Sequence, residues 1–433
     1  MKITVKLLLR TVLYAFLSLS TLSVPLFAET LEDAWKTALS VDHHLQASHK
    51  NMEAGRQYLL AAKAARMPAL NFESGYTILN QDPSALINSP AFPVKEMPVS
   101  EDKSLSYKAT LTVPLFTSGL ISRNIDAANA ALKTAGHDEK KTVLDVKLSV
   151  AESYVSVLRT KRLVGVTESN VASLSSHSKD VSNFYEQGMI TRNDLLASQV
   201  ALADARQRSL QAQNNLNIAH AAFNRLLGRP LDHEVSLEDL SSEFMKTDVQ
   251  SLTAKALDSR PELSSLSEQS KALRDQAAGI RSSALPQLAL SGAYSYQQNK
   301  YQVYEDLWSA TIGLKWEVFD GGISRHNAAA LQMKADALNE LRSDTASLIS
   351  LQVRQACLDV EETVKRIEVT REAVTQSEEN LKVTKDRYRE GIGTNTEVLD
   401  AESLRIRSYS NYYNAIYDAV MSQIRLKYAT GEL

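Results

Sequence analysis

The second half of this chain repeats the first half at a fixed offset, so the fold must be built from two copies of one long unit. Tyr388 follows Tyr185 by 203 residues, and the sequence around both reads Tyr-x-x-Gly-x-x-Thr-x-x-Asp/Glu. The pairs at this offset are Gly188 and Gly391, Thr191 and Thr394, Asp194 and Glu397, and the segments 115–119 and 318–322.

The first 28 residues have the pattern of a secretory signal peptide. Lys2, Lys6 and Arg10 are basic, an apolar run extends from Thr11 to Phe27, and the small residue Ala28 follows. A basic start, an apolar middle and a small exit residue are typical of export signals. We therefore expect cleavage after residue 28 in an exported protein; a retained membrane anchor is the alternative.

Charge and cysteine content exclude several classes of function. The chain carries 48 Lys and Arg against 51 Asp and Glu, a net charge of -3, and loss of the basic leader makes it more acidic. This balance argues against a nucleic-acid partner. The single cysteine, Cys357, cannot form a disulfide within the chain, and its helical context predicts a buried side chain.

Each copy contains a long stretch that favours helix. No proline occurs between Gly119 and Leu227 or between Gly322 and Ala429, and helix-forming residues are abundant in both. A helix over 120–187 would be about 100 Å long, which predicts coiled-coil rods. In the first rod, apolar residues recur at helical spacing on two adjacent faces: Leu144, Leu148, Ala151, Val155 and Leu158, and Val143, Val150, Tyr154 and Val157.

Glycine and threonine mark the point at which each rod reverses. Gly188 and Gly391 suit the left-handed position that ends a helix. Thr191 is a good N-cap with Asp194 three residues later, and the second copy repeats this arrangement as a Thr-x-x-Glu capping box. Each copy is therefore predicted to be a long helix, a tight turn and a returning helix.

Strand patterning precedes each rod. Apolar and polar residues alternate over 104–115 and 308–318, and more weakly over 70–76 and 288–294. We expect β-hairpins at about 68–116 and 286–319, each preceded by a helix, at about 30–66 and 250–284. These first helices align at an offset of 218, so the first copy has 15 extra residues. They fall in a proline-rich segment, 80–104, that we expect to be a loop.

The predicted strands suit a membrane barrel that several chains share. Their length fits a tilted membrane-spanning strand, although the edge of a soluble sandwich is an alternative. The smallest membrane barrels have about eight strands, and open strand edges cannot lie in lipid. Four strands per chain therefore require two, three or four chains in one barrel, and the pattern alone does not choose among them.

Together these motifs resemble those of the TolC family of outer-membrane efflux proteins. The resemblance covers two repeats, 29–228 and 250–433, with a linker at 229–249. It implies an α+β membrane protein whose duplicated long helical hairpins form a periplasmic α-barrel, and whose four β-strands per chain contribute to a trimeric 12-stranded β-barrel in the outer membrane. Besides the turns, the motifs that carry it are Pro68 and Pro286 before each first strand and the strand-to-helix passages at 115–119 and 318–322.

The same resemblance implies a passive channel with partners. A homotrimer would stand in outer-membrane lipid and conduct substrates from a periplasmic adaptor (membrane fusion) protein and an inner-membrane transporter of RND, ABC or MFS type to the exterior. Multidrug or metal efflux and type I secretion are both compatible with it. The alternative from another class is an exported coiled-coil structural protein of the envelope.

By the resemblance, the helix turns form the periplasmic tips on which the adaptor docks. Glycine and threonine would suit any helical hairpin, so the turn chemistry alone does not require docking. The expected docking residues are Gly188, Thr191, Leu195 and Leu196 in one tip, and Gly391, Thr394, Val398 and Leu399 in the other.

The resemblance also implies gate and constriction residues beside the tips. Asp194 and Tyr388 match positions that link neighbouring helices in the closed state. Glu397 and Asp400 match an acidic ring at the tunnel entrance, where carboxylates would favour cations. The usual basic partner of the gate would fall at Gly393, so this chain must hold its closed state differently.

The sequence predicts no catalytic residue, cofactor or metal site. His43, His44 and His49 lack the spacing of a helical ligand pair, and we expect them on a solvated surface. No phosphate-binding loop or nucleophilic triad is recognisable.

Overall fold

A computed structural model describes residues 28–89, 92–240 and 248–433 and divides the chain into two compact units. The predicted signal peptide lies outside the described residues except for Ala28. The first unit, here called the helical unit, comprises Met1–Leu45, Val143–Ser259 and Leu351–Leu433. The second, here called the sheet unit, comprises Gln46–Thr142 and Arg260–Ser350.

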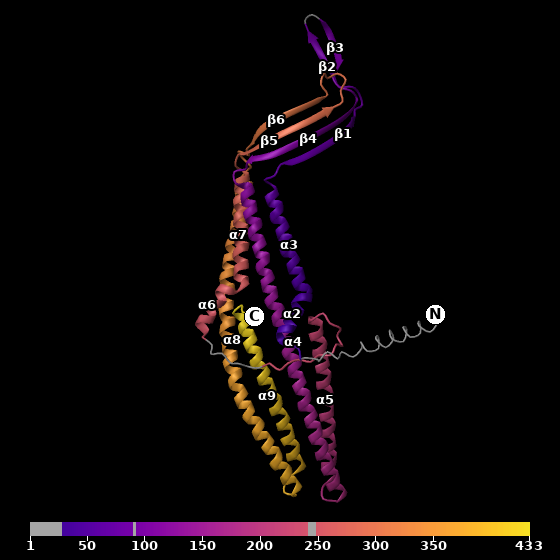
Figure 1. The fold of residues 1–433 in the computed structure, drawn as a ribbon, viewed down its shortest axis with the longest axis vertical. Helices are drawn as coiled ribbons and strands as arrows, with labels where there is room; N and C mark the ends of the chain where they lie inside the picture. The colour runs from indigo at the N-terminus through magenta and orange to yellow at the C-terminus, as the bar shows by residue number, and fades with distance from the viewer. Residues whose placement is uncertain (1–27, 90–91, 241–247) are drawn as a thin grey trace, which may run out of the picture. The chain divides into compact units, whose positions relative to one another are not determined.

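The two predicted rods and their returning helices are confirmed. The rods α4 (Leu120–Glu186) and α8 (Ile323–Arg389) both have 67 residues, and the returning helices α5 (Arg192–Leu226) and α9 (Asn395–Ala429) both have 35. These helices form the two helical hairpins seen in Figure 1. Within the described ranges, no helix is both long enough and apolar enough to cross a membrane.

The shorter helices that precede the sheet strands are each interrupted, which the sequence analysis did not predict. The first is divided into α2 (Leu31–Val41) and α3 (His43–Ala64), and the second into α6 (Val249–Ser259) and α7 (Pro261–Ser283). Asp42 has extended backbone and its carboxylate accepts a hydrogen bond from the amide of Leu45. Arg260 is extended because it precedes Pro261, whose ring disfavours a helical residue before it.

The core of the helical unit forms around α4, where the predicted apolar residues from Val150 to Leu158 are buried and Leu144 and Leu148 pack against them partly exposed. Tyr154 is fully buried, and its ring meets that of Phe223 edge to face at 5.9 Å between centroids. Its hydroxyl lies 2.7 Å from the backbone carbonyls of Glu29 and Glu238. Tyr154 thus joins the rod to the segment before α2 and to the inter-repeat linker. Cys357 is buried, as predicted.

The sheet unit contains a four-stranded antiparallel sheet in the order β1-β4-β5-β6. Its strands are β1 (Ala69–Ile78), β4 (Lys103–Phe116), β5 (Gln287–Gln297) and β6 (Asp306–Lys315). Both edge strands, β1 and β6, are exposed along their whole length. Both predicted hairpins are present, and the pairing of β4 with β5 joins the two copies into one sheet.

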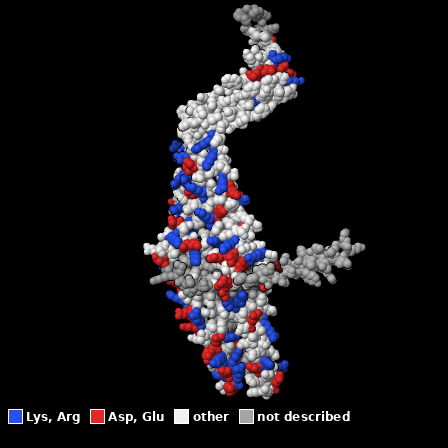
Figure 2. Space-filling view, viewed as in Figure 1, with Lys and Arg blue, Asp and Glu red and all other residues white. Residues whose placement is uncertain are grey.

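The two faces of this sheet differ in chemistry because successive side chains point to opposite sides of a strand. On one face, Phe72 pairs with Ala109, and Tyr294 pairs with both Ala109 and Trp308. On the other face, Glu73 pairs with Lys108. Figure 2 shows the sheet as a largely uncharged band, in contrast to the mixed charges on the helices.

The proline-rich segment expected to be a loop is instead a second hairpin. The strands β2 (Ser84–Ser89) and β3 (Phe92–Pro98) form a separate two-stranded sheet, with residues 90–91 outside the described ranges. Proline is tolerated here because both strands of a two-stranded ribbon are edge strands, which leave backbone groups unpaired on one side. The extra residues of the first copy therefore form a β-ribbon.

Glycines with positive φ allow the chain to pass from strand to helix. Gly119 has φ +88 before α4 and Gly322 has φ +90 before α8, a conformation that favours glycine. The carboxylate of Asp320 accepts hydrogen bonds from the amides of Gly322 and Ser324, at 2.8 and 2.7 Å. A hydrogen bond from the side chain of Ser324, followed by these two amide bonds, lowers the pKa of Asp320. They satisfy amides at the start of α8.

Candidate functional site

Both helical hairpins reverse through the same hydrogen-bonded turn. After α4, the amides of Gly188 and Met189 donate to the carbonyls of Tyr185 and Phe184, both at 2.9 Å. After α8, Gly391 repeats this arrangement, and φ is +71 at Gly188 and +73 at Gly391. This is the Schellman ending, which needs a left-handed residue at its glycine. The predicted turns are confirmed.

Threonine caps start both returning helices. The amide of Asp194 donates to Thr191 Oγ1 at 3.3 Å, and that of Glu397 donates to Thr394 Oγ1 at 3.3 Å. Glu397 also accepts a hydrogen bond from the amide of Thr394, which completes a capping box. The carboxylate of Glu397 thus has a structural role besides the predicted place in an acidic ring.

An apolar tip cluster packs directly behind the turns. Val398 is fully buried and lies in this cluster, so it supports the tip from inside rather than from its outer surface. Leu195 of the other turn packs against the cluster. The buried members of the tip cluster are Val181, Leu381, Tyr388, Val398 and Ala401.

The other predicted docking residues lie mostly on the surface. Gly188, Thr191, Gly391 and Thr394 are exposed, whereas Leu399 is half-buried. Two large apolar side chains beside the glycines, Met189 and Ile392, are 65% and 69% exposed, and Leu196 is 48% exposed. Whether these side chains contact an adaptor stays a prediction.

Asn395, the first residue of α9, connects the two turns. It is buried, and its Nδ2 donates to the backbone carbonyl of Asp194 at 3.0 Å. Its Oδ1 lies 2.8 Å from Nε2 of His177 on α4. Because Nδ2 is the donor to a carbonyl, Oδ1 must be the acceptor, and His177 Nε2 carries the proton. Burial lowers the pKa of His177, in keeping with a neutral ring.

The predicted partners Asp194 and Tyr388 approach each other without a hydrogen bond. Tyr388 packs between the rings of His177 and Phe184, at 5.3 and 5.9 Å. Among the described residues, its buried hydroxyl has no hydrogen-bond partner. Burial, followed by the negative charges of Asp194 and Asp180, raises the pKa of Tyr388. Their role as a gate link stays a prediction.

Asp400 is exposed, and within the described part of the chain no hydrogen bond or ion pair engages its carboxylate. Glu397, one turn before it on α9, is exposed as well. Residues three apart are neighbours on a helix surface, so the two carboxylates lie close together beside the turn. This position is compatible with an acidic ring, which a single chain does not test.

Gly393 is the position at which the family resemblance places a basic gate partner, and the turn there lies close to the backbone at the end of α8. A Cβ at Gly393 would lie 3.0 Å from the backbone nitrogen of Tyr388 and 3.2 Å from the carbonyl carbon of Arg387. Basic side chains near this turn lie on α8. Arg389 reaches the carboxylate of Asp180 on α4 at 3.8 Å.

A buried charge cluster lies behind the tip, and no local sequence motif predicts it. The carboxylate of Glu402 on α9 is buried and accepts hydrogen bonds from Lys385 on α8 and Ser173 on α4. The sequence does distinguish the buried polar residues near the tip, because they differ from their counterparts in the other repeat. At an offset of 203 residues, the counterparts of Lys385, Asn395 and Glu402 are Ser182, Arg192 and Gln199, and that of His177 is Asn380.

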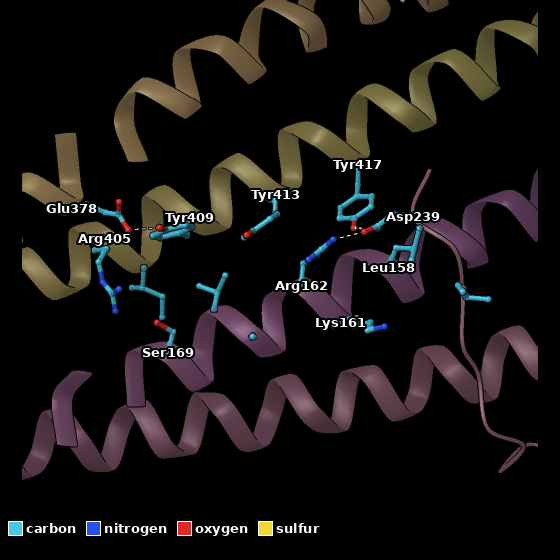
Figure 3. Close-up of a pocket in the computed structure, with 14 residues that line it drawn as sticks. Leu158, Lys161, Arg162, Ser169, Asp239, Glu378, Arg405, Tyr409, Tyr413 and Tyr417 are labelled. Atoms are coloured by element: carbon cyan, nitrogen blue, oxygen red, sulfur yellow. Dashed lines mark hydrogen bonds and ion pairs between the residues drawn. The ribbon is translucent and has the colours of Figure 1, made fainter. Parts of the chain in front are cut away.

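A cavity of about 500 Å³ lies farther from the turns, between α4 and α9 (Figure 3). Tyr409, Tyr413 and Tyr417 line it from α9. Two of them are engaged, since Tyr417 donates to Asp239 at 3.1 Å and Tyr409 donates to Glu378. The bond to Glu378 raises the pKa of Tyr409 to about 12. The cavity walls are therefore held by hydrogen bonds between α9, α8 and the linker.

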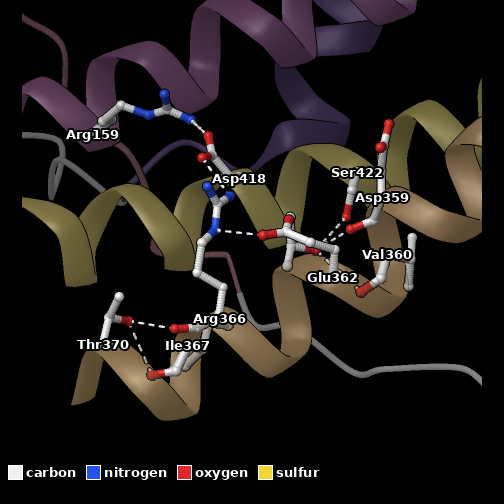
Figure 4. A network of polar contacts seen from close by, with 10 residues as sticks. Arg159, Asp359, Val360, Glu362, Arg366, Ile367, Thr370, Asp418 and Ser422 are labelled. Atoms are coloured by element: carbon white, nitrogen blue, oxygen red, sulfur yellow. Dashed lines mark hydrogen bonds and ion pairs between the residues drawn. The ribbon is translucent and has the colours of Figure 1, made fainter. Parts of the chain in front are cut away.

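A second carboxylate, Asp418, also connects three helices (Figure 4). It lies on α9 and forms ion pairs with Arg159 of α4 at 2.6 Å and with Arg366 of α8 at 2.8 Å. Its side chain is 32% exposed, so solvent screens these pairs more than those of Glu402.

The three histidines before the sheet, His43, His44 and His49, are exposed, as predicted. His49 Nδ1 lies 2.9 Å from a carboxylate oxygen of Glu139, and Nε2 lies 3.4 Å from one of Glu53. Over the described ranges, no group of three or more His, Cys, Asp or Glu is arranged to hold a metal ion.

Comparison with known proteins shows similarity along nearly the whole chain. The family model for outer membrane efflux proteins matches residues 34–229 and 252–432. The chain is 23% identical to the outer membrane protein TolC of Vibrio cholerae, over 97% of this chain and 95% of that protein. It is 25% identical to the alkaline protease secretion protein AprF of Pseudomonas aeruginosa, over 94% of this chain and 85% of AprF.

Solved structures show the same fold. The outer membrane protein VceC of Vibrio cholerae superposes with a TM-score of 0.79 at 17% identity, over 93% of this chain and 96% of VceC. Both repeats, the helical hairpins and the four-stranded sheet thus have counterparts in a protein of known structure.

Proposed function

Because this chain belongs to the outer membrane efflux protein family, we propose that three copies of it close one β-barrel in the outer membrane, continued by a helical tunnel in the periplasm. The channel is passive, and its partners supply the energy. The relatives are outer membrane and secretion proteins by name, which supports the location.

The observation that carries this proposal is the incomplete sheet. Both edge strands, β1 and β6, are exposed along their length, and the edges of a sheet in lipid must be paired. Pairing β6 of one copy with β1 of the next closes the sheet without new strands. Three copies with four strands each give 12 strands, within the known range of membrane barrels.

The two faces of the sheet support the same assembly. The face that bears Phe72, Tyr294 and Trp308 is apolar and would contact lipid, whereas the face that bears Glu73 and Lys108 would line an aqueous lumen. Lipid-facing and lumen-facing side chains alternate in such barrels.

The tips are proposed as the docking surface for a periplasmic adaptor, with an inner-membrane transporter of RND, ABC or MFS type behind it. The exposed apolar side chains Met189, Leu196 and Ile392 support this surface. Membership of an efflux protein family supports efflux, and similarity to an alkaline protease secretion protein supports type I secretion. Crosslinking in cells, followed by identification of the captured adaptor and transporter, would distinguish the two.

Two measurements test the channel itself. Purified protein should run as a heat-sensitive trimer in detergent, and it should conduct ions after reconstitution into planar bilayers. An elongated particle that stays in solution without detergent and conducts nothing would refute the channel, and would favour a structural protein of the envelope.

A further inference from the structure

The side chain of Glu402 on α9 is only 2% exposed, although it is a carboxylate. Lys385 Nζ of α8 lies 2.6 Å from its Oε1, and Ser173 of α4 donates to the same oxygen. Lys385 also donates to Ser173 Oγ at 2.6 Å. One carboxylate therefore joins three helices, and we call Glu402, Lys385, Ser173 and Arg405 the Glu402 cluster.

The energetics of this cluster depend on all partners staying in place. A buried charge is costly unless it is paired and hydrogen-bonded, and removal of one partner leaves the other uncompensated. Arg405, one turn later on α9, approaches Oε2 at 3.4 Å. Within the described residues Oε2 has no hydrogen-bond partner, so the bonds through Oε1 hold the carboxylate in position.

The cluster lies directly behind the tip cluster. Ala401, the neighbour of Glu402, and Tyr388, one turn after Lys385, both belong to the tip cluster. If the α8–α9 hairpin moved away from α4, Glu402 and Lys385 would move together, and the bonds to Ser173 would break. The carboxylate of Glu402 would then be exposed to water on the face of α9 that now packs against α4.

We propose that Glu402 is the positioning residue that keeps the α8–α9 hairpin packed on α4 when the tunnel entrance is closed. The proposal rests on the proposed function, since it takes the α8–α9 turn as part of a channel entrance. It gives this chain an anchor for its closed state in place of the basic side chain that Gly393 cannot supply.

Asp418 provides a matched control. It connects the same three helices through Arg159 and Arg366, but it lies 16 residues farther along α9 from the turn and is 32% exposed. Removing its charge should loosen the helices there without releasing the tip. Comparison of Glu402→Gln with Asp418→Asn therefore separates control of the tip from general loss of bundle stability.

Hydrogen exchange of the detergent-solubilised full chain tests the anchor without relying on conduction. In Glu402→Gln, amides of residues 386–396 should exchange at least about tenfold faster, the factor expected from loss of a charge-assisted hydrogen bond. Asp418→Asn should leave that segment unchanged. Lys385→Met combined with Glu402→Gln should exchange more slowly than Glu402→Gln alone, because no unpaired cation remains.

The proposal is overturned if Glu402→Gln leaves exchange at the turn unchanged, or if Asp418→Asn accelerates it equally. If Glu402→Gln fails to assemble, Ser173→Ala is the alternative variant, because it removes only the contact with α4. Hydrogen exchange of the same amides should then accelerate by a smaller factor. Unchanged exchange at the turn in Ser173→Ala also overturns the proposal.

Conductance separates this proposal from the proposed function. In planar bilayers, Glu402→Gln should conduct severalfold more than the wild type, and Asp418→Asn should match the wild type. If no variant conducts while the turn of Glu402→Gln still exchanges faster, the channel is refuted and the anchor stands. If the wild type conducts and Glu402→Gln conducts equally, the role of Glu402 in the entrance is refuted.

Discussion

Asn395 Nδ2 donates to the backbone carbonyl of Asp194 at 3.0 Å, and this bond joins the start of α9 to the first turn of α5. Both helices begin at a tip, so one buried amide side chain couples the two turns. The coupling extends to α4 through His177. The two tips of a chain are thus one hydrogen-bonded structure rather than two independent hairpins.

Replacing Asn395 with Leu should uncouple the tips. The carbonyl of Asp194 and the ring of His177 would lose their partner while buried, at a cost of about 1–3 kcal/mol. Hydrogen exchange should accelerate at both turns, near residues 188–194 and 391–397. Its counterpart in the repeat, Arg192, is exposed, and Arg192→Ala should affect neither turn. Acceleration at the second turn alone would contradict the coupling.

Acidification should loosen the tips through His177. Burial lowers the pKa of His177 below 6.5, so the opened tip binds a proton more readily than the packed one. The contribution of neutral His177 to the stability of the packed tip is present at neutral pH. It is lost as the pH falls through 6.5 towards the lowered pKa of His177. The charged or titratable groups that act on this ring are Lys385 and Tyr388 of α8, Glu402 of α9 and Asp180 of α4.

Hydrogen exchange at the turns between pH 8 and pH 5, corrected for the intrinsic pH dependence of exchange, measures this effect. His177→Gln keeps an amide donor for Asn395 without a titrating ring, so its corrected exchange should not change over this range. An equal pH response in wild type and His177→Gln would assign the effect to another group.

Neutralising Asp400 should weaken block of the channel by divalent cations. In a trimer, the exposed carboxylates of Asp400 would meet around one axis, where they attract multivalent cations. Asp400→Asn should raise the half-blocking concentration severalfold and raise conductance. Asp204 on α5 is also exposed, and Asp204→Asn should leave block unchanged. Unaltered block in Asp400→Asn would remove this residue from the constriction.

A side chain at Gly393 should strain the second turn. In Gly393→Arg, the Cβ would press against the backbone of Tyr388, and overpacking of this kind costs about 1–3 kcal/mol. Thermal unfolding should shift to lower temperature. Gly165 on α4 has open space where a Cβ would lie, so Gly165→Ala should stabilise the helix by about 0.5–1 kcal/mol. A fully stable Gly393→Arg protein would show that the turn can relax.

The sequence predicted the rods, caps and sheet hairpins because their signals are local. Gly188 and Thr191 specify a helix end and a helix start within a few residues, and the alternation in β4 and β5 is visible without any partner. The breaks at Asp42 and Arg260 were overlooked although Pro261 marks one of them. The β2–β3 ribbon differs from the expected loop because proline, which breaks a central strand, is tolerated on an edge strand.

The candidate site was less predictable because its key contacts join distant segments. Lys385 and Glu402 are ordinary helix residues in sequence, and only folding brings them to Ser173, more than 200 residues away along the chain. The roles of Asp194, Tyr388, Glu397 and Asp400 are implied by family resemblance alone, and Asp400→Asn tests one of them. Departures from the internal repeat point to the buried contacts better than any local motif.

The two open edges of the sheet have a genetic consequence. If β6 of each chain must pair with β1 of the next, a chain with a defective edge strand prevents the closure of every barrel that contains it. When half of the chains in a cell carry such a defect and mix at random, only about one trimer in eight is free of it. Edge-strand mutations in β1 or β6 should therefore be dominant, whereas mutations that prevent export of the chain should be recessive.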